Sequence, residues 1–165
     1  MAEELELTPK LLYEVEGESA GDHFGFSVLP WADLNDDGIV DFVASTWGGE
    51  SQNGSGAIPP YLKILSGLDG EELGTIEGAG CGFGGWPGCG ALSDLNGDGV
   101  SEFYAKTVSD LDDPNLTRLQ TTIYSGNEPY RTHAYPSNGR NGNDVGDLDQ
   151  DGIGDYAITI GGGTG

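Results

Sequence analysis

Basic residues are scarce in this chain. Lys and Arg together number six against 28 Asp and Glu, so the formal net charge is −22 at pH 7. A charge of this size and sign repels the phosphate backbone of nucleic acids and the surface of an anionic membrane. The chain also lacks an apolar run of the roughly 18 residues that a membrane-spanning helix requires. The sequence therefore excludes nucleic acid as a partner and predicts no membrane insertion.

Side chains suited to catalysis are also few. The chain has two His, His23 and His133, for which surface or core roles are ordinary. It contains no Gly-x-Ser-x-Gly elbow, no His-Glu-x-x-His pair and no phosphate-binding Gly loop. Its clustered carboxylates resemble the acid pair of a glycosidase, but metal binding accounts for them better. We therefore expect a protein that is not an enzyme, with no catalytic and no cofactor-binding residues.

Cysteine is limited to Cys81 and Cys89. They bracket a turn-rich segment, 82–88, that contains four Gly and one Pro. Such a segment can reverse the chain and bring the two sulfur atoms together. We expect a small disulfide loop, with two free thiols as the alternative.

Glycine, by contrast, is abundant and spread along the whole length, with 30 residues in 165. This distribution is typical of many short strands joined by tight turns rather than of a low-complexity linker. A chain of this length is also long enough to form a domain with a sizeable core. The composition therefore predicts an all-β protein.

A nine-residue motif occurs three times, at 33–41, 94–102 and 147–155. In each copy, oxygen-bearing side chains occupy positions 1, 3, 5 and 9, a Gly occupies position 6, and position 7 is apolar and can offer only its carbonyl. Hard oxygen donors around one point suit Ca²⁺, and the Gly permits a sharp turn of the backbone. The motif predicts three Ca²⁺ sites.

Two other interpretations of the motif are possible. Asp, Asn and Gly are common in turns for conformational reasons alone, but three matching copies favour metal binding. An EF-hand or dockerin-like loop would require an acid at position 12 and a helix beyond it. Position 12 is Ala44, Ala105 and Ile158, each within a β-prone run, and this argues against the helical alternative.

Strand-like segments surround the three loops at a regular spacing. The segments 22–28, 42–47, 61–67 and 71–78 form one predicted unit of four strands, and 103–108, 119–126 and 130–135 belong to the next. The segment 10–17 resembles 71–78 and predicts a lone fourth strand, while 156–160 follows the third loop. The loops start 61 residues apart (33 to 94) and then 53 apart (94 to 147). Four-stranded antiparallel sheets at this period are typical of β-propeller blades. The predicted organisation is a lead-in (1–9) and a propeller segment (10–165) with blade 1 (22–78), blade 2 (79–136) and partial blade 3 (137–165).

The chain resembles the FG-GAP repeat, the blade of integrin-α-like propellers. The resemblance rests on Phe24-Gly25, on the Asp-x-Asn-x-Asp-Gly-x-x-Asp loop and on the strand leading to Trp47-Gly48-Gly49. Departures are Glu102 at a position usually held by Asp, Phe83-Gly84 two residues out of step, and a third copy without Phe-Gly. The resemblance implies that the calcium ligands are Asp33, Asn35, Asp37, Ile39 (carbonyl) and Asp41; Asp94, Asn96, Asp98, Val100 (carbonyl) and Glu102; and Asp147, Asp149, Asp151, Ile153 (carbonyl) and Asp155.

The resemblance also implies a function outside the cell. We expect a calcium-stabilised extracellular or cell-surface module for adhesion or self-assembly, although the acidic start of the chain lacks the basic region of a secretion signal. Two predicted complete blades and one partial blade do not close a propeller of about four to eight blades. The chain is therefore expected to be an excerpt of a larger propeller or to form a homo-oligomeric ring or filament, with strand 11–16 completing a neighbouring sheet.

Carbohydrate binding is the alternative function. Trp31, Trp47 and Trp86 could stack on sugars, although such rings more often pack in cores. The sequons that begin at Asn53 and Asn115 are a modest indication of glycosylation.

Overall fold

The computed structural model of this chain describes residues 10–47, 49–50, 57–81, 88–108, 119–126, 131–136 and 142–158. Within these residues the protein is all-β and antiparallel, with no helix, as the composition predicts. It follows that no helix in the described part is long and apolar enough to cross a membrane. The predicted lead-in (1–9), Trp86 and the sequon residues Asn53 and Asn115 lie outside the described residues.

The first sheet contains four strands in the order β1-β2-β5-β6. These strands are β1 (Ser27–Pro30), β2 (Phe42–Ser45), β5 (Tyr61–Leu65) and β6 (Glu72–Glu77). Each neighbouring pair is antiparallel. The last three coincide with the predicted strands at 42–47, 61–67 and 71–78. A short hairpin of β3 (Gly49–Glu50) and β4 (Ala57–Ile58) lies between β2 and β5.

The second sheet repeats this order with a divided first strand. Its strands β9 (Phe103–Val108), β10 (Leu119–Tyr124) and β11 (Arg131–Pro136) lie side by side. Two short strands, β7 (Ala79–Gly80) and β8 (Gly90–Ala91), share the first position, because both pair with β9. The third sheet consists of β12 (Gly142–Gly146) and β13 (Asp155–Ile158). The first strand of the third copy, β12, thus forms without the Phe-Gly that the first copy has.

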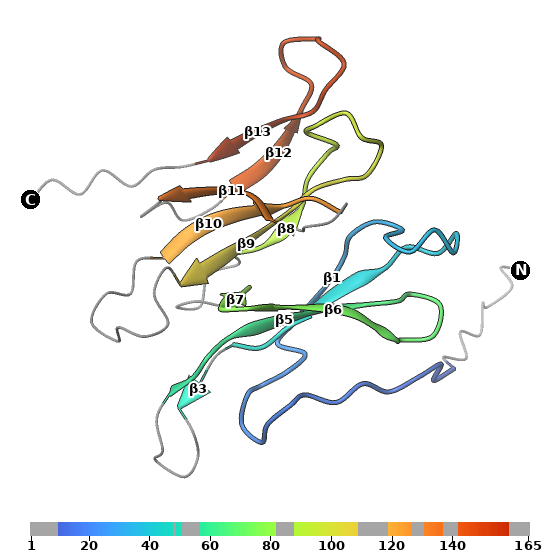
Figure 1. The fold of residues 1–165 in the computed structure, drawn as a ribbon, viewed down its shortest axis with the longest axis vertical. Helices are drawn as coiled ribbons and strands as arrows, with labels where there is room; N and C mark the ends of the chain where they lie inside the picture. The colour runs from blue at the N-terminus through green and yellow to red at the C-terminus, as the bar shows by residue number, and fades with distance from the viewer. Residues whose placement is uncertain are drawn as a thin grey trace, which may run out of the picture.

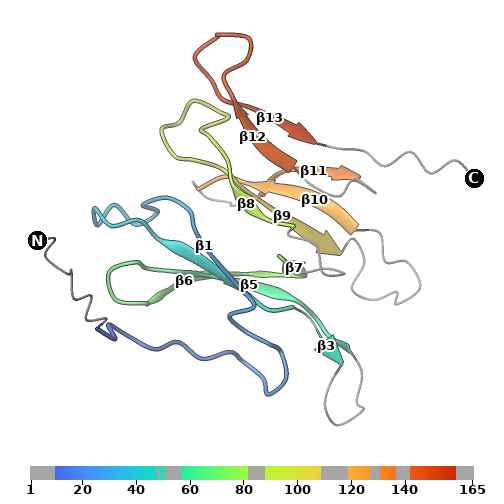
Figure 2. The same cartoon turned by 180° about the vertical axis from the view of Figure 1, so that it is seen from behind.

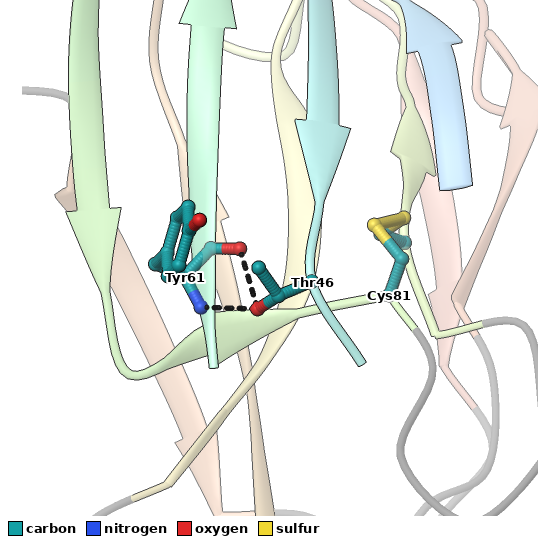
Figure 3. Close-up of a disulfide and its surroundings, with 4 residues drawn as sticks. Thr46, Tyr61 and Cys81 are labelled. Carbon is teal, nitrogen blue, oxygen red and sulfur yellow. Dashed lines mark hydrogen bonds between the residues drawn. A yellow bond between two sulfur atoms is a disulfide. The ribbon is translucent and has the colours of Figure 1, made fainter. Parts of the chain in front are cut away.

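A disulfide between Cys81 and Cys89 joins the two pieces of the divided strand. The two Cα atoms are 4.9 Å apart, and both cysteines are buried between the first and second sheets. The disulfide expected from the sequence is confirmed. Figure 3 shows it near the point where Thr46 ties β2 to β5, with the Thr46 hydroxyl accepting from the Tyr61 N–H at 2.9 Å.

The sheets are stacked face to face, with the third beyond the second (Figures 1 and 2). Alternate residues of each strand point to opposite faces. The core between the first and second sheets is apolar and contains Trp31, Val43, Leu62, Ile64, Ala79, Cys81, Cys89, Phe103, Ala105 and Tyr124. A smaller cluster joins the second and third sheets through Leu92, Tyr104 and Ile123, with Leu95 and Tyr156 packed against it.

The structure assigns no strand to the segment 10–17, where a lone fourth strand is predicted, and the segment has no strand partner within the described residues. The segment lies against the outer face of the first sheet rather than along a strand edge. The ring of Tyr13 stacks on Phe42 with centroids 6.3 Å apart, and its hydroxyl donates to the Gly67 carbonyl at 3.3 Å. Among the residues that the structure describes, these contacts to a sheet face give the backbone of the segment no neighbouring strand.

The next segment, 18–26, also covers this outer face. The Asp22 carboxylate accepts from the Tyr61 hydroxyl at 2.6 Å and from the N–H groups of Ser19 and Phe24. Burial alone would raise the pKa of Asp22, but these hydrogen bonds hold it below its usual value. His23 and Gly25 have positive φ angles of 57° and 81°. The predicted first strand at 22–28 is therefore a turn up to residue 26, and β1 starts at Ser27.

Lys63 on β5 provides the charged contact beneath this segment. Its Nζ lies 2.8 Å from Glu72 and 3.6 Å from Glu18. The hydrogen bond to Glu72, together with the charges of Glu72 and Glu18, raises the pKa of Lys63 even though the side chain is mostly buried. The outer face of the first sheet is thus closed by aromatic, hydrogen-bonded and ionic contacts to residues 13–24.

Candidate metal centre

The three acidic loops lie at the same edge of the stack, one in each sheet (Figures 1 and 2). Each connects the first and second strands of its sheet, as predicted: β1 to β2, β8 to β9 and β12 to β13. Backbone hydrogen bonds close the base of the first loop, from Trp31 N to Asp41 O and from Asp41 N to Ala32 O, both at 2.8 Å. The absence of a helix after any loop within the described residues agrees with the argument against an EF-hand.

A common set of hydrogen bonds shapes all three loops. In the first, the carboxylate of Asp33 at position 1 accepts from the N–H groups of Asp37 (3.1 Å) and Gly38 (2.8 Å). Asn35 Oδ1 accepts from the same Asp37 N–H at 3.1 Å, and Asp37 Oδ1 accepts from Ile39 N–H at 2.8 Å. The loop backbone therefore turns around the acidic side chains, which hold it from the inside.

The second and third loops repeat this set residue for residue. Position 1 accepts from positions 5 and 6, position 3 from position 5, and position 5 from position 7. The carboxylate at position 9 accepts from the N–H at position 2 in every copy. The residues whose carbonyls are predicted ligands, Ile39, Val100 and Ile153, therefore donate their N–H to the acid at position 5. A shared backbone geometry follows from the shared spacing of the acids.

Two residues of each loop adopt positive φ angles. Position 6 is the expected Gly in each copy, with φ of 85°, 91° and 92° at Gly38, Gly99 and Gly152. Position 4 is also left-handed, and there it is Asp36 (59°), Gly97 (76°) or Gln150 (64°). Asp tolerates this region better than most residues and Gly occupies it freely. The requirement at position 4 was not visible in the sequence, because Gln150 carries no such preference.

Carboxylates converge most closely in the second and third loops. Oxygen atoms of Asp94, Asp98 and Glu102 lie within 4.8 Å of one another, as do those of Asp147, Asp149 and Asp151. No other described acidic, His or Cys residues form a group of three this compact, and that includes the carboxylates of the first loop. The structure thus brings three acids together in two of the three predicted sites. In the first site, the Asn35 amide nitrogen lies 3.0 Å from Asp37 Oδ2.

The acid at position 9 is the most buried member of the first two loops. Asp41 is 0% exposed and Glu102 is 2% exposed, whereas Asp155 is only half-buried. Glu102 folds back into its loop despite its extra methylene, and it accepts from Leu95 N at 2.5 Å and Asn96 Nδ2 at 2.8 Å. Burial raises the pKa of Glu102, and the charges of Asp98 and Asp94 add to this rise while the Leu95 hydrogen bond opposes it.

A Ser-Gly pair at the end of the third strand completes the first two loops. Gly67 N donates to Asp41 Oδ1 at 3.0 Å, and Ser66 Oγ makes a long contact of 3.5 Å to Asp37. In the second loop, Ser125 Oγ lies 3.5 Å from Asp98 and 3.4 Å from Asn96 Nδ2. The sequence shows the repeated Ser-Gly, but only the fold reveals its contact with acids 25 or more residues away.

Aromatic residues divide between the core and the surface. Trp31 is buried and packs against Phe103 with tilted rings, and its Nε1 donates to the Ser101 carbonyl at 2.8 Å. Trp47 does not follow the expected core packing, since it is 45% exposed and stacks on Phe26, which is 50% exposed. The His23 ring lies 5.9 Å from Trp47. His133 lies on β11.

The donor set of the loops fits a hard divalent cation. Carboxylates, an amide oxygen and backbone carbonyls are the ligands that Ca²⁺ prefers. Three carboxylates within 4.8 Å repel one another, and a cation between them would remove this repulsion. Comparison with protein-family models finds no match, and comparison with curated proteins likewise finds none.

Proposed function

We propose that this chain is a calcium-stabilised, non-enzymatic module of the FG-GAP β-propeller type that serves adhesion or self-assembly outside the cell. The observation that supports the proposal best is the hydrogen-bond set that all three acidic loops share, with the oxygen-bearing side chains at positions 1, 3, 5 and 9 on the inside of each turn. Side chains gathered in this way bind an ion and stiffen the turn. Ions enclosed by five protein ligands have little room for a substrate.

Self-assembly would use the third sheet. β13 pairs only with β12 within the described residues, and we propose that its other edge takes a strand from a second copy. From the sequence, residues 11–16 are expected to complete a neighbouring sheet. In the structure this segment packs on its own first sheet through Tyr13. The proposed contact is therefore strand addition at β13, in a ring or a filament according to the rotation between copies.

Calcium binding is tested by isothermal titration of the chelator-treated protein, with light scattering on the same samples. The expected result is three Ca²⁺ ions per chain, with the third site weakest because Asp155 is more exposed than Asp41 and Glu102. Light scattering should show a mass larger than one chain in Ca²⁺. An absence of binding heat at any Ca²⁺ concentration would refute the metal proposal, and a monomeric mass in Ca²⁺ would refute self-assembly.

Carbohydrate binding remains the second candidate, because the stacked rings of Phe26 and Trp47 are about half exposed. Flat aromatic faces of this kind can pack against the apolar face of a sugar ring. A glycan array should then show binding that Trp47→Ala abolishes and that Trp31→Phe, a substitution in the core, retains. An array without bound glycans, or with glycans that Trp47→Ala still binds, would exclude a sugar site at these rings.

A further inference from the structure

Gly154, at position 8 of the third loop, lies directly against the start of the second loop. Its N–H donates to the Asp94 carbonyl at 3.1 Å. The contact is so close that a Cβ added to Gly154 would lie 2.3 Å from Ser93 Cβ and 2.9 Å from Ser93 Oγ. Ser93 also hydrogen-bonds to the carboxylate of Asp144 on β12. The third loop and its first strand thus hold the two residues from which the second loop begins.

Asp94 is the residue on which the second loop depends most. Its carboxylate accepts from the N–H groups of Asn96, Gly97, Asp98 and Gly99, at distances of 2.7 to 3.2 Å. The same carboxylate belongs to the group of three within 4.8 Å. A shift of the Asp94 backbone would therefore move the centre of the loop and one of its proposed ligands together. The Gly154 hydrogen bond fixes that backbone from outside the loop.

The first and second loops are linked in a different way. The equivalent position 8 of the second loop, Ser101, receives its hydrogen bond from the buried indole of Trp31, which precedes the first loop. This link runs through a core side chain that the packing against Phe103 already holds in place. The first loop therefore serves as an internal reference whose ion binding should not respond to the third loop.

Calcium should strengthen the contact between the second and third loops. Without an ion, the third loop holds four carboxylates, at Asp147, Asp149, Asp151 and Asp155, and repulsion between them favours open conformations. An ion would order the loop and with it the Gly154 N–H, so that the second loop would lose less conformational freedom when it binds its own ion. Direct repulsion between the two ions acts in the opposite direction. Salt weakens this repulsion, because at 0.15 M exposed charges more than about 8 Å apart are largely screened from each other.

We propose that Gly154 couples the second and third sites, so that an ion in the third loop tightens calcium binding in the second. This inference rests on the proposed calcium-binding function and concerns its regulation. By thermodynamic reciprocity, an ion in the second loop tightens binding in the third to the same extent.

The test uses amide NMR signals of ¹⁵N-labelled protein during a Ca²⁺ titration. Gly38, Gly99 and Gly152 each donate an N–H to the position 1 carboxylate of their own loop, at 2.8, 2.8 and 2.9 Å, so their signals report the three sites separately. Asp151→Asn removes one acid from the third loop at nearly constant volume. The Gly152 response should move to much higher Ca²⁺, the Gly99 midpoint should rise about five-fold or more, and the Gly38 midpoint should stay unchanged.

Two further variants keep the result interpretable. Gly154→Ala retains every acid and its φ is not left-handed, so it acts through the contacts with Ser93 and the Asp94 carbonyl and should also raise the Gly99 midpoint. Asp36→Asn removes one charge at a position that is not a proposed ligand and should leave the Gly99 midpoint unchanged. The Gly99 shift should persist at 0.5 M salt. If Asp36→Asn has the same effect as Asp151→Asn, the coupling is bulk charge and the inference is wrong.

The outcomes separate this inference from the proposed function. If none of the three glycine signals responds to Ca²⁺ in the unmodified protein, calcium binding itself is refuted. If all three respond but the Gly99 midpoint is the same in the unmodified protein and in both third-loop variants, the sites bind independently. In that case the coupling is overturned while calcium binding stands.

Discussion

Removal of Ca²⁺ with a chelator is expected to lower the thermal unfolding midpoint of this protein by about 20 °C. Each ion bound at about 100 times its dissociation constant stabilises the folded state by about 2.7 kcal/mol, so three ions contribute about 8 kcal/mol. For a protein of 150 to 250 residues, a change of 1 kcal/mol moves the midpoint by about 2–4 °C. Because whole domains are stable by only about 5–15 kcal/mol, the metal-free chain would be close to unfolding.

Differential scanning calorimetry with EGTA and then with excess Ca²⁺ measures this effect. Excess Ca²⁺ should restore the original midpoint, and the same concentration of Mg²⁺ should restore little of it, because Mg²⁺ prefers a smaller octahedral site. A midpoint that does not change with EGTA would mean that the three loops are held by their internal hydrogen bonds alone. The proposed calcium ligands would then be wrong as a set.

Replacement of Gly67 by Ala is expected to destabilise the protein by about 3 kcal/mol, as for a severe case of overpacking. The added Cβ would lie 2.1 Å from the Val40 carbonyl oxygen and 3.0 Å from Ile39 Cγ2. Because the nearest atom belongs to the backbone of the first loop, the loop itself must move. The movement would also break the hydrogen bond from Gly67 N to the buried Asp41 carboxylate. Urea unfolding in Ca²⁺ measures the change in free energy.

Gly126→Ala is the matched control, because Gly126 occupies the same place in the second sheet. There the added Cβ would lie 2.3 Å from Val100 Cγ1 and 2.8 Å from Leu34 Cδ2, which are side-chain ends that can rotate away. Its expected cost is about 1 kcal/mol, at the low end for overpacking. Equal losses in the two variants would show that the clash with the Val40 carbonyl has no special role in the first loop.

The loops and the strands that follow them could be predicted from the sequence because their signals are local. Oxygen-bearing side chains at alternate positions and a Gly at position 6 determine the turn, and the β-prone runs from Phe42, Phe103 and Tyr156 give the next strand. Cys81 and Cys89 could be paired for the same reason, since the segment between them is short and turn-rich. The all-β class followed from these elements together.

The errors arose where contacts between distant segments decide the structure. Residues 10–17 alternate like a strand, yet Tyr13 packs on Phe42 across the sheet face. Asp22 draws residues 22–26 into a turn through its bond to Tyr61, which is 39 residues away. The support that Ser66 and Gly67 give to the first loop arises only when β5 lies beside β2. None of these contacts leaves a periodic pattern in the sequence.

The ring of Tyr13 covers the outer face of the first sheet much as a neighbouring sheet would. Phe42 and Phe103 are equivalent residues, each following the last acid of its loop, and Trp31 of the preceding sheet covers Phe103. Tyr13 covers Phe42 in the same way, although no sheet precedes it within the described residues. Within the described residues, the outer face of the first sheet is therefore covered by the chain's own side chains. A copy that docked on this outer face would have to displace Tyr13, Glu18 and Phe24, so the covered face favours the proposed strand addition at β13 over the stacking of sheet faces.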